Sequence, residues 1–185
     1  MGKRFVAVLA IFAAVLVAAP PAGAAPGAPA ASEAYCGITW GSLAKSAGPS
    51  TRPHSPLTNI RTGEHTCFDR MVVDVSRLAP GYRVRYVTHV YTVAQGVLLP
   101  LGGGARLEIV LRAPDHDTQG GVTYPVTTGA RLPGVDLTGY RTFRNARYGG
   151  SFEGVTIVGL ALRARLPFRV FKLDHRLVID VAHQW

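Results

Sequence analysis

The pattern of apolar and polar positions repeats at three places far apart in the chain, residues 70–75, 106–111 and 176–181. Residues 70–75 read Arg-Met-Val-Val-Asp-Val, and residues 176–181 read Arg-Leu-Val-Ile-Asp-Val. Because side chains alternate across a β-strand, the second, fourth and sixth residues share an apolar face and the charged residues lie on the other face. We interpret the three segments as equivalent strands of a layered β fold. The alternative is that short strands resemble one another by chance.

Further strands are indicated by runs of β-branched and aromatic residues between Gly and Pro residues. They are expected at residues 57–61, 82–93, 122–126, 153–163 and 168–173, with a short edge strand at 36–40. Turns are expected at residues 79–81, 101–104, 149–150 and 174–175. Beyond the N-terminal region no helical period is sustained. The sequence therefore predicts an all-β protein, a sandwich of two small sheets.

The alternation also predicts the core. The expected buried side chains are Met71, Val73, Val75, Val84, Tyr86, Leu107, Ile109, Leu111, Leu177, Ile179 and Val181. Phe168 and Phe171 differ in parity, so a regular strand would place only one of them on the buried face.

Residues 1–24 have the features of a secretory signal peptide. Lys3 and Arg4 precede an uncharged apolar run over residues 5–19, and residues 22–24 (Ala-Gly-Ala) match the small-x-small cleavage pattern. The apolar run is shorter than the roughly 20 residues of a membrane-spanning helix. We therefore expect cleavage and no transmembrane anchor afterwards. An uncleaved anchor is the alternative.

The rest of the chain is expected to form one domain. Residues 25–34 are rich in Ala, Pro and Gly and form a low-complexity leader, and residues 35–185 form the domain. Without the two cations of the signal peptide, 18 basic residues remain against 11 acidic ones, a net charge of +7. A basic exported protein favours anionic partners such as wall polymers or anionic lipid surfaces. No nucleic-acid-binding motif is present, so nucleic acid is not an expected partner.

Residues that could carry chemistry are few. Cys36 and Cys67 are an even number of cysteines in an exported chain and are expected to form a disulfide. Asp115-His116-Asp117 contains metal-ligand residue types, but adjacent side chains of an extended chain point to opposite sides. No serine stands in a Gly-x-Ser-x-Gly elbow. We expect no metal ion, cofactor or catalytic residue.

Four parts of the sequence carry a family resemblance: Cys67-Phe68-Asp69-Arg70 with Val73-Asp74-Val75, Leu107 to Pro114, Ser151-Phe152-Glu153-Gly154-Val155-Thr156, and Arg163 to Phe171 with Arg176 to His183. Together they resemble the AMIN-like domain of exported actinobacterial proteins, over roughly Cys36 to Trp185. This family is related to the AMIN domain of cell-wall amidases and secretins. The resemblance implies a sandwich of two small sheets and a role in targeting to the envelope, often by contact with peptidoglycan.

The candidate ligand-binding residues are basic and aromatic. We define the arginine patch as Arg141, Arg144, Arg147, Arg163 and Arg165. Tyr124, Tyr140 and Tyr148 are candidates for stacking on sugar rings. In an ideal strand Arg144 would face away from Arg141 and Arg147, so a bend near Asn145 or Gly149 is needed to gather them.

The preferred hypothesis is a secreted, non-enzymatic module that binds the cell envelope, contacting peptidoglycan or an anionic wall polymer. Two alternatives stay open. The protein could be an adaptor that binds another exported protein through a sheet edge. It could also be an unrecognised hydrolase, which turnover of wall fragments would reveal.

The first testable prediction concerns processing. Signal peptidase should cleave after the small residues that follow the apolar run, giving a mature N-terminus near Ala25. Intact-mass measurement of the exported protein checks this. A mass that still includes residues 5–19 would contradict it.

Overall fold

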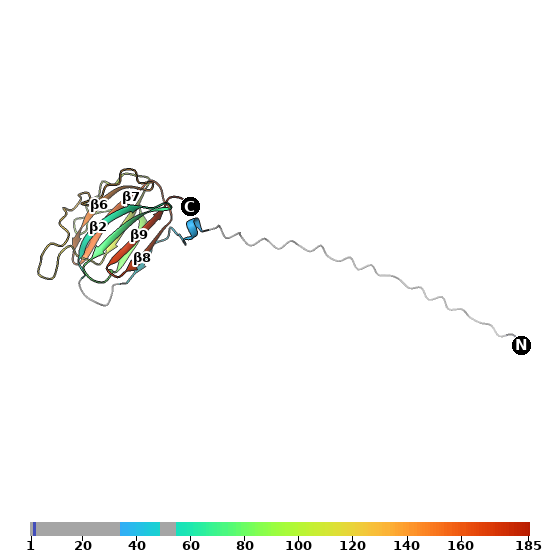
Figure 1. Ribbon diagram of the computed structural model, residues 1–185, viewed down its shortest axis with the longest axis horizontal. Helices are drawn as coiled ribbons and strands as arrows, with labels where there is room; N and C mark the ends of the chain where they lie inside the picture. The colour runs from blue at the N-terminus through green and yellow to red at the C-terminus, as the bar shows by residue number, and fades with distance from the viewer. Residues whose placement is uncertain (1, 3–33, 49–54) are drawn as a thin grey trace. The chain divides into compact units, whose positions relative to one another are not determined.

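The structure is a computed structural model that describes residue 2, residues 34–48 and residues 55–185. The predicted signal peptide apart from residue 2, and the leader apart from residue 34, lie outside the described residues. Residues 33–185 make up one compact unit. Its described part contains nine β-strands and one 3-10 turn, η1 (Tyr35–Gly37) (Figure 1).

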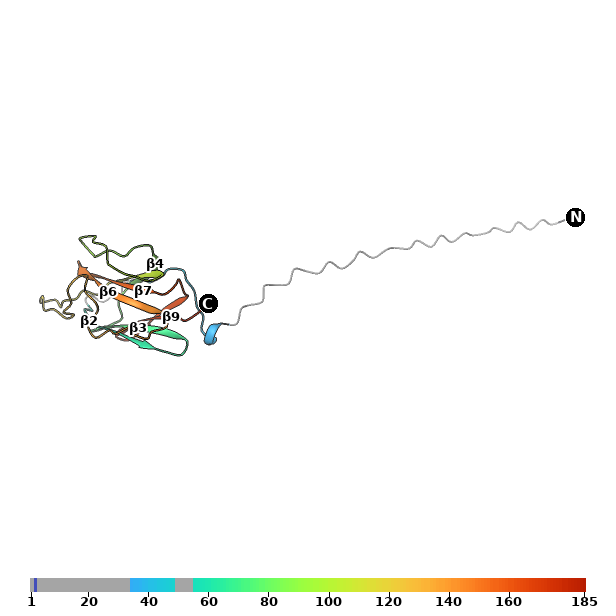
Figure 2. The same cartoon turned by 90° about the horizontal axis from the view of Figure 1, so that it is seen from above.

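The strands form two antiparallel sheets packed face to face. One sheet has the order β1 (Lys45–Ala47), β4 (Tyr82–Val87), β5 (Ala105–Leu111), β7 (Val155–Leu162) and β6 (Phe143–Phe152). The other has the order β2 (Leu57–Glu64), β3 (Phe68–Val75), β9 (Arg176–Ala182) and β8 (Phe168–Leu173). Figure 2 shows the two layers edge-on. The predicted all-β sandwich of two small sheets is confirmed.

The repeated sequence pattern pairs with itself in the four-stranded sheet. Strands β3 and β9 are antiparallel neighbours, with Arg70 opposite Asp180 and Asp74 opposite Arg176. The pattern is self-complementary because both strands have an Arg four residues before an Asp. When two such strands run antiparallel, the Arg of each strand lies opposite the Asp of the other. The third copy of the pattern is β5, in the middle of the five-stranded sheet. All three segments are strands, as expected.

The core lies between the sheets and contains the predicted side chains. Of these, Met71, Val73, Val75, Val84, Leu107, Ile109, Leu111, Leu177, Ile179 and Val181 are buried. Tyr86 is half-buried, and its hydroxyl donates to the Leu166 carbonyl oxygen. Phe168 is buried and Phe171 only half-buried, as their opposite parity required.

Two expected strands are absent from the described residues. Residues 36–40 begin in η1 instead, because Cys36 and Gly37 have φ values of 56° and 66°, which an extended strand cannot accommodate. Residues 122–126 contribute only a single bridge from Val122 to His116. Pro125 lacks the N–H that a strand ladder needs.

Strand β4 is shorter than the predicted 82–93, because the chain leaves the ladder after Val87. The following loop folds back over the outer face of the five-stranded sheet, where Val90, Leu99 and Leu101 pack around Ala161. Gly159 makes room for the loop, since a Cβ there would lie 2.5 Å from a Leu101 methyl carbon. The apolar residues after Val87, which predicted a longer strand, thus cover the outer face of the five-stranded sheet.

The glycine pair at 149–150 is not the expected turn. It lies inside β6, where the pairing with β7 shifts register between Tyr148 and Ser151. A Cβ on Gly149 would lie 2.8 Å from the Ile157 side chain, and Gly150 has a φ of 92°. The glycines therefore form a bulge. The reversal comes later, at residues 153–154, which both have positive φ.

The pairing predicts that the middle of β9 is sensitive to truncation. Ile179 is fully buried opposite Met71, so Ile179→Ala should lower the free energy of unfolding by about 2–5 kcal/mol. Leu173 in β8 is 49% exposed, and Leu173→Ala should change it by less than about 0.5 kcal/mol. Chemical denaturation measures both free energies. A loss below about 1 kcal/mol for Ile179→Ala would show that Ile179 does not face the core.

Candidate functional site

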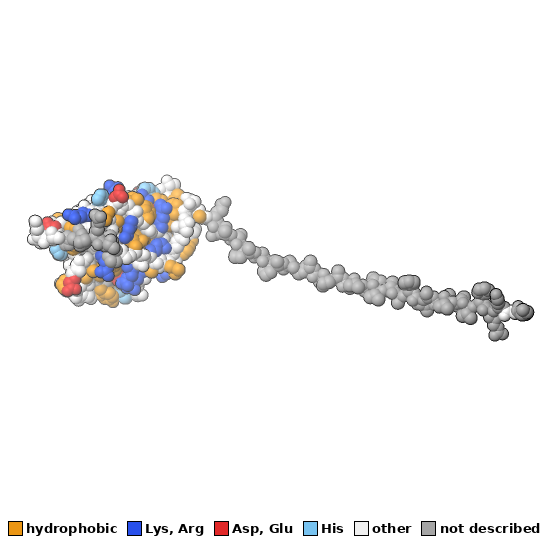
Figure 3. Space-filling view, turned by 90° about the horizontal axis from the view of Figure 1, so that it is seen from below, with side chains coloured by type: hydrophobic (Ala, Val, Ile, Leu, Met, Phe, Trp, Pro, Cys, Tyr) orange, Lys and Arg blue, Asp and Glu red, His pale blue; other side chains and the backbone are white. Residues whose placement is uncertain are grey.

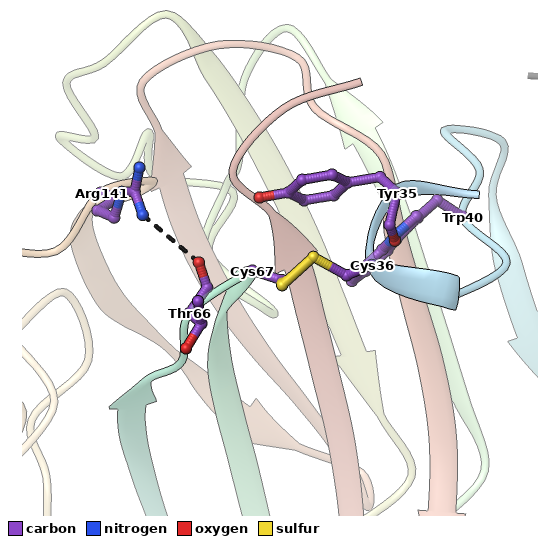
Figure 4. Close-up of a disulfide and its surroundings, with 6 residues drawn as sticks. All are labelled: Tyr35, Cys36, Trp40, Thr66, Cys67 and Arg141. Carbon is purple, nitrogen blue, oxygen red and sulfur yellow. Dashed lines mark hydrogen bonds between the residues drawn. A yellow bond between two sulfur atoms is a disulfide. The ribbon is translucent and has the colours of Figure 1, made fainter. Parts of the chain in front are cut away.

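Two members of the arginine patch lie where β6 begins. Arg141 is exposed, and its Nη1 donates to the carbonyl oxygen of Thr66 over 3.4 Å (Figure 4). Arg144 is also exposed, and its Nη1 donates to the carbonyl oxygens of Tyr140 and Phe143 over 2.7 and 2.9 Å. A second N–H group, on Nη2, reaches the carbonyl oxygen of Arg141. Both guanidinium groups are therefore held by backbone.

Two further members lie at the same end of the sandwich, where β7 ends. The Arg163 N–H donates to the carbonyl oxygen of Thr142, next to Arg141. The Arg163 guanidinium donates to the carbonyl oxygen of His183. Arg165 lies with its guanidinium carbon 4.7 Å from the centre of the Tyr86 ring, and its Nη2 also donates to a carbonyl oxygen, that of Ser42.

Arg147 lies further along β6 and is half-buried. Its Nη1 donates to the carbonyl oxygen of Gly129 over 3.0 Å, and its Nε is buried without a hydrogen-bond partner among the described residues. The register of β6 shifts between Phe143 and Asn145, so Arg144 is an extra residue in the strand. This is the kind of irregularity that the spacing of the arginines required. The structure brings four arginines to one end and places Arg147 apart.

Positive charge on the arginine patch is not compensated locally. Within the described residues, the ion pairs of arginine involve Arg61, Arg70, Arg83, Arg85, Arg169 and Arg176, with Asp74, Asp180 and Glu108. The members of the patch bond to neutral carbonyl oxygens instead, which orient a guanidinium without cancelling its charge. Figure 3 shows cationic side chains interleaved with apolar ones and only small acidic areas on the face in view.

A polar hollow of about 300 Å³ adjoins Arg144. Its lining includes Arg131, Asp136, Thr138 and Asn145. The Asp136 carboxylate accepts the Thr138 N–H over 2.9 Å, so it is partly engaged by the chain itself. With two arginines and one carboxylate, the hollow suits a polar group that carries negative charge.

The three candidate tyrosines contribute mainly to packing. Tyr124 and Tyr148 are 3% and 1% exposed, with ring centres 5.7 Å apart. Burial raises the pKa of Tyr124 to about 12. The pKa of Tyr148 is also raised, by burial and by the hydrogen bond from its hydroxyl to Asp115. Rings this buried offer no face to a sugar, and both belong to the hydrophobic core.

Tyr140 is half-buried beside the arginine patch. Its ring stacks on Phe143 with centres 5.9 Å apart and 8° between the planes, and its hydroxyl donates to Thr62 Oγ1. The carbonyl oxygen of Tyr140 also accepts from Arg144. Its backbone therefore helps to orient Arg144.

A buried carboxylate joins the two sheets beneath the patch. Asp69 of β3 is fully buried, and its Oδ2 accepts the N–H groups of Thr142 and Phe143 over 2.6 and 2.9 Å. Its Oδ1 lies 2.9 Å from Nε2 of His183, which is 4% exposed. This network fixes the start of β6 and hence the backbone that carries Arg141 and Arg144. The sequence signal, missed at first, is an acidic residue at a core position of a strand.

A second buried carboxylate lies on the outer face of the four-stranded sheet. Asp180 points outward as the alternation predicts, yet it is fully buried, because Arg70 and Arg169 on the two neighbouring strands lie over it. Their Nε atoms donate to its oxygens over 2.6 and 2.8 Å. Both guanidiniums also lie over the rings of Phe68 and Phe171, at 5.1–5.6 Å. The expected charged face is thus a packed layer.

The described residues contain no group of three or more His, Cys, Asp or Glu side chains arranged to hold a metal ion. In the 115–117 segment, Asp115 Oδ2 accepts the Tyr148 hydroxyl over 2.7 Å, and Oδ1 lies 3.0 Å from His116 Nδ1. These bonds tie the loop to the core. The predicted disulfide between Cys36 and Cys67 is present (Figure 4). Among described residues, no helix has the length and apolarity to cross a membrane.

The described residues thus form a small β-sandwich with one disulfide and a group of exposed arginines at one end. The family model of the AMIN-like domain matches residues 55–183, more than half of the chain, and the chain belongs to the AMIN-like domain family. AMIN-like domains are generally non-catalytic binding modules related to the cell envelope. Comparison with curated proteins and with solved structures gave no match.

The network around Asp69 yields the third prediction. Asp69→Ala should lower the free energy of unfolding by at least about 3 kcal/mol, since each buried donor left without an acceptor costs about 1–3 kcal/mol. Asp136→Ala is the matched control, because this exposed carboxylate also accepts a backbone N–H, and it should cost far less. Similar denaturation curves for the two variants would contradict a sheet-joining role for Asp69.

Proposed function

We propose that this protein is a secreted, non-enzymatic module that binds the cell envelope by contacting peptidoglycan or an anionic wall polymer through the arginine patch. The observation that carries the proposal is the bonding of the patch. Its guanidiniums are oriented by neutral carbonyl oxygens, whereas six other arginines of the described residues form ion pairs with carboxylates.

The chemistry of the patch fits carboxylate or phosphate groups. A guanidinium has five N–H donors in a fixed fork, and each bond to a carbonyl oxygen occupies one donor and leaves others for a ligand. Wall polymers carry carboxylates or phosphodiesters in repeating arrays. Several arginines at one end of the sandwich can contact such an array together, and oriented side chains lose less conformational entropy on binding.

Secretion is supported by two independent features. The N-terminal sequence has the cation, apolar run and small residues of a signal peptide. The Cys36–Cys67 disulfide is of a kind that persists in oxidising compartments outside the cytoplasm.

A protein partner is the second candidate, because β2 lies at an edge of the four-stranded sheet and is eight residues long. An extended peptide can add to such an edge through main-chain hydrogen bonds. That mode depends little on salt, whereas contact through exposed arginines weakens as salt screens the charges. A salt series therefore separates the two candidates.

Replacement of Arg141, Arg144 and Arg165, three exposed members of the patch, by Ser is the fourth prediction. Exposed charges contribute little to stability, so the triple variant should fold with nearly the wild-type Tm. It should sediment less with intact wall sacculi, and its residual binding should depend less steeply on salt. Sedimentation across a salt series, beside a thermal melt, measures both.

The matched control replaces Arg61, Arg83 and Arg176 by Ser. These arginines are also exposed but pair with Asp74 or Glu108. The control removes the same formal charge and should bind sacculi nearly as the wild type does. Equal loss in both triple variants would assign binding to net charge alone, and wild-type sedimentation of the patch variant would reject the patch.

A further inference from the structure

Residues 35–48, which we call the strap, run from the four-stranded sheet to the five-stranded sheet along one side of the sandwich. At its start Cys36 is bonded to Cys67, the residue before β3. Gly41 then forms a bridge with Phe168 at the edge of β8. The strap ends as β1, which pairs with the edge of β4. It thus covers one edge of each sheet.

Among the described residues, the strap is held besides the disulfide by the Gly41–Phe168 bridge, by β1 and by a few side-chain contacts, including Arg169, whose guanidinium carbon lies 5.5 Å from the centre of the Trp40 ring. The Trp40 ring lies 6.0 Å from that of Phe68, and the Lys45 ammonium lies 4.8 Å from the centre of the Phe168 ring. Strand β1 has only three residues. A ladder this short is marginal alone, so the covalent bond is the main anchor of the N-terminal half of the strap.

One member of the arginine patch bonds to the strap, and a second bonds beside the disulfide. Arg165 donates to the carbonyl oxygen of Ser42, which is part of the strap. Arg141 donates to the carbonyl oxygen of Thr66, the neighbour of Cys67 (Figure 4). The acceptors of Arg144 are on Tyr140, Phe143 and Arg141 itself, none of which belongs to the strap or adjoins the disulfide. Thr66 lies in the β2–β3 turn, which the bond from the His65 N–H to the Phe68 carbonyl oxygen closes without the disulfide, so release of the strap bears on Arg165 selectively.

We propose that the Cys36–Cys67 disulfide is a redox latch that holds the strap and, through Ser42, keeps Arg165 of the arginine patch in its binding geometry. This inference rests on the proposed function, because it concerns regulation of the same site. Cys36 is exposed and Cys67 half-buried, so an external reductant can reach the bond. Opening the bond frees the strap and removes the fixed acceptor of Arg165, the Ser42 carbonyl oxygen.

The reductant is a dithiol, and the reaction is ordinary thiol–disulfide exchange. A thiolate of the dithiol attacks Cys36 Sγ, the more exposed sulfur, and the Cys67 thiolate leaves. The second thiolate of the reductant then attacks the reductant's first sulfur, which is bonded to Cys36 Sγ, and the Cys36 thiolate leaves. Two electrons pass to the protein, both cysteines end as thiols after protonation, and the reductant becomes a disulfide.

Hydrogen exchange with mass spectrometry tests the latch without any ligand. Reduction by a dithiol should accelerate exchange in residues 35–48 and at the Phe168 N–H, which donates to Gly41. The amides of Ile109 and Val158, paired in the centre of the other sheet, should keep their protection and show that the domain remains folded. Unchanged exchange across the strap after reduction would overturn the latch.

Binding of inorganic polyphosphate, measured by titration at low salt, tests the effect on the patch. Reduced protein, and the Cys36→Ser/Cys67→Ser variant, should bind about fivefold more weakly than oxidised protein, because oriented donors lose less freedom on binding. Arg165→Gln should bind more weakly in both states and show a smaller redox difference. Arg144→Gln, the matched control, should bind more weakly and keep the full difference.

The outcomes separate this inference from the proposed function. If oxidised protein binds polyphosphate and reduced protein binds it equally well, the patch stands and its regulation by the latch is rejected. If oxidised protein does not bind polyphosphate or sacculi, the proposed function fails, and the redox control of binding fails with it. The exchange experiment still decides in that case whether the disulfide holds the strap.

Discussion

The pairing of β3 with β9 is the contact on which the rest of this structure depends. It places alternating apolar residues of both strands against the opposite sheet, and it places Arg70 across from Asp180 on the outer surface. At one end of the same pair, Asp69 and His183 reach across to the start of β6. The core, the outer charged layer and the backbone beneath the arginine patch therefore all share one register. A shift by one residue would exchange the faces and lose all three together.

Alternation along the chain was sufficient to predict the fold class and nearly all of the expected core, because β3, β5 and β9 each have one clearly apolar face. It did not predict where β4 ends, since residues 88–101 are as apolar as a strand but cover the outer face of a sheet above Gly159. It also misread the glycines at 149–150, whose close approach to Ile157 depends on the neighbouring strand. Contacts between segments distant in sequence decided both cases.

The candidate site shows a similar division. The sequence identified which residues are basic, but which arginines keep their charge depends on the carboxylates that the fold places beside them. Arg70 and Arg169 are bound to Asp180, whereas Arg141 and Arg144 are bound only to carbonyl oxygens. The sequence made Tyr148 a candidate for stacking on a sugar, but it lies inside the domain, beside the bulge in β6 and bonded to Asp115. Local residue types name the donors, and tertiary contacts decide which of them are available.

The position of β9 has a consequence for how the molecule is made. Strand β9 is inserted between β3 and β8, which both precede it in the sequence, so the four-stranded sheet has an empty central place until β9 has been made. A nascent chain grows from its N-terminus, and β3 must wait for a partner that pairs with it across 110 residues of separation, as between Arg70 and Asp180. Until then the edge of β3 is open to other chains. The four-stranded sheet therefore closes only after β9 has been made, and a chain that stops before β9 leaves β3 and β8 without their common neighbour.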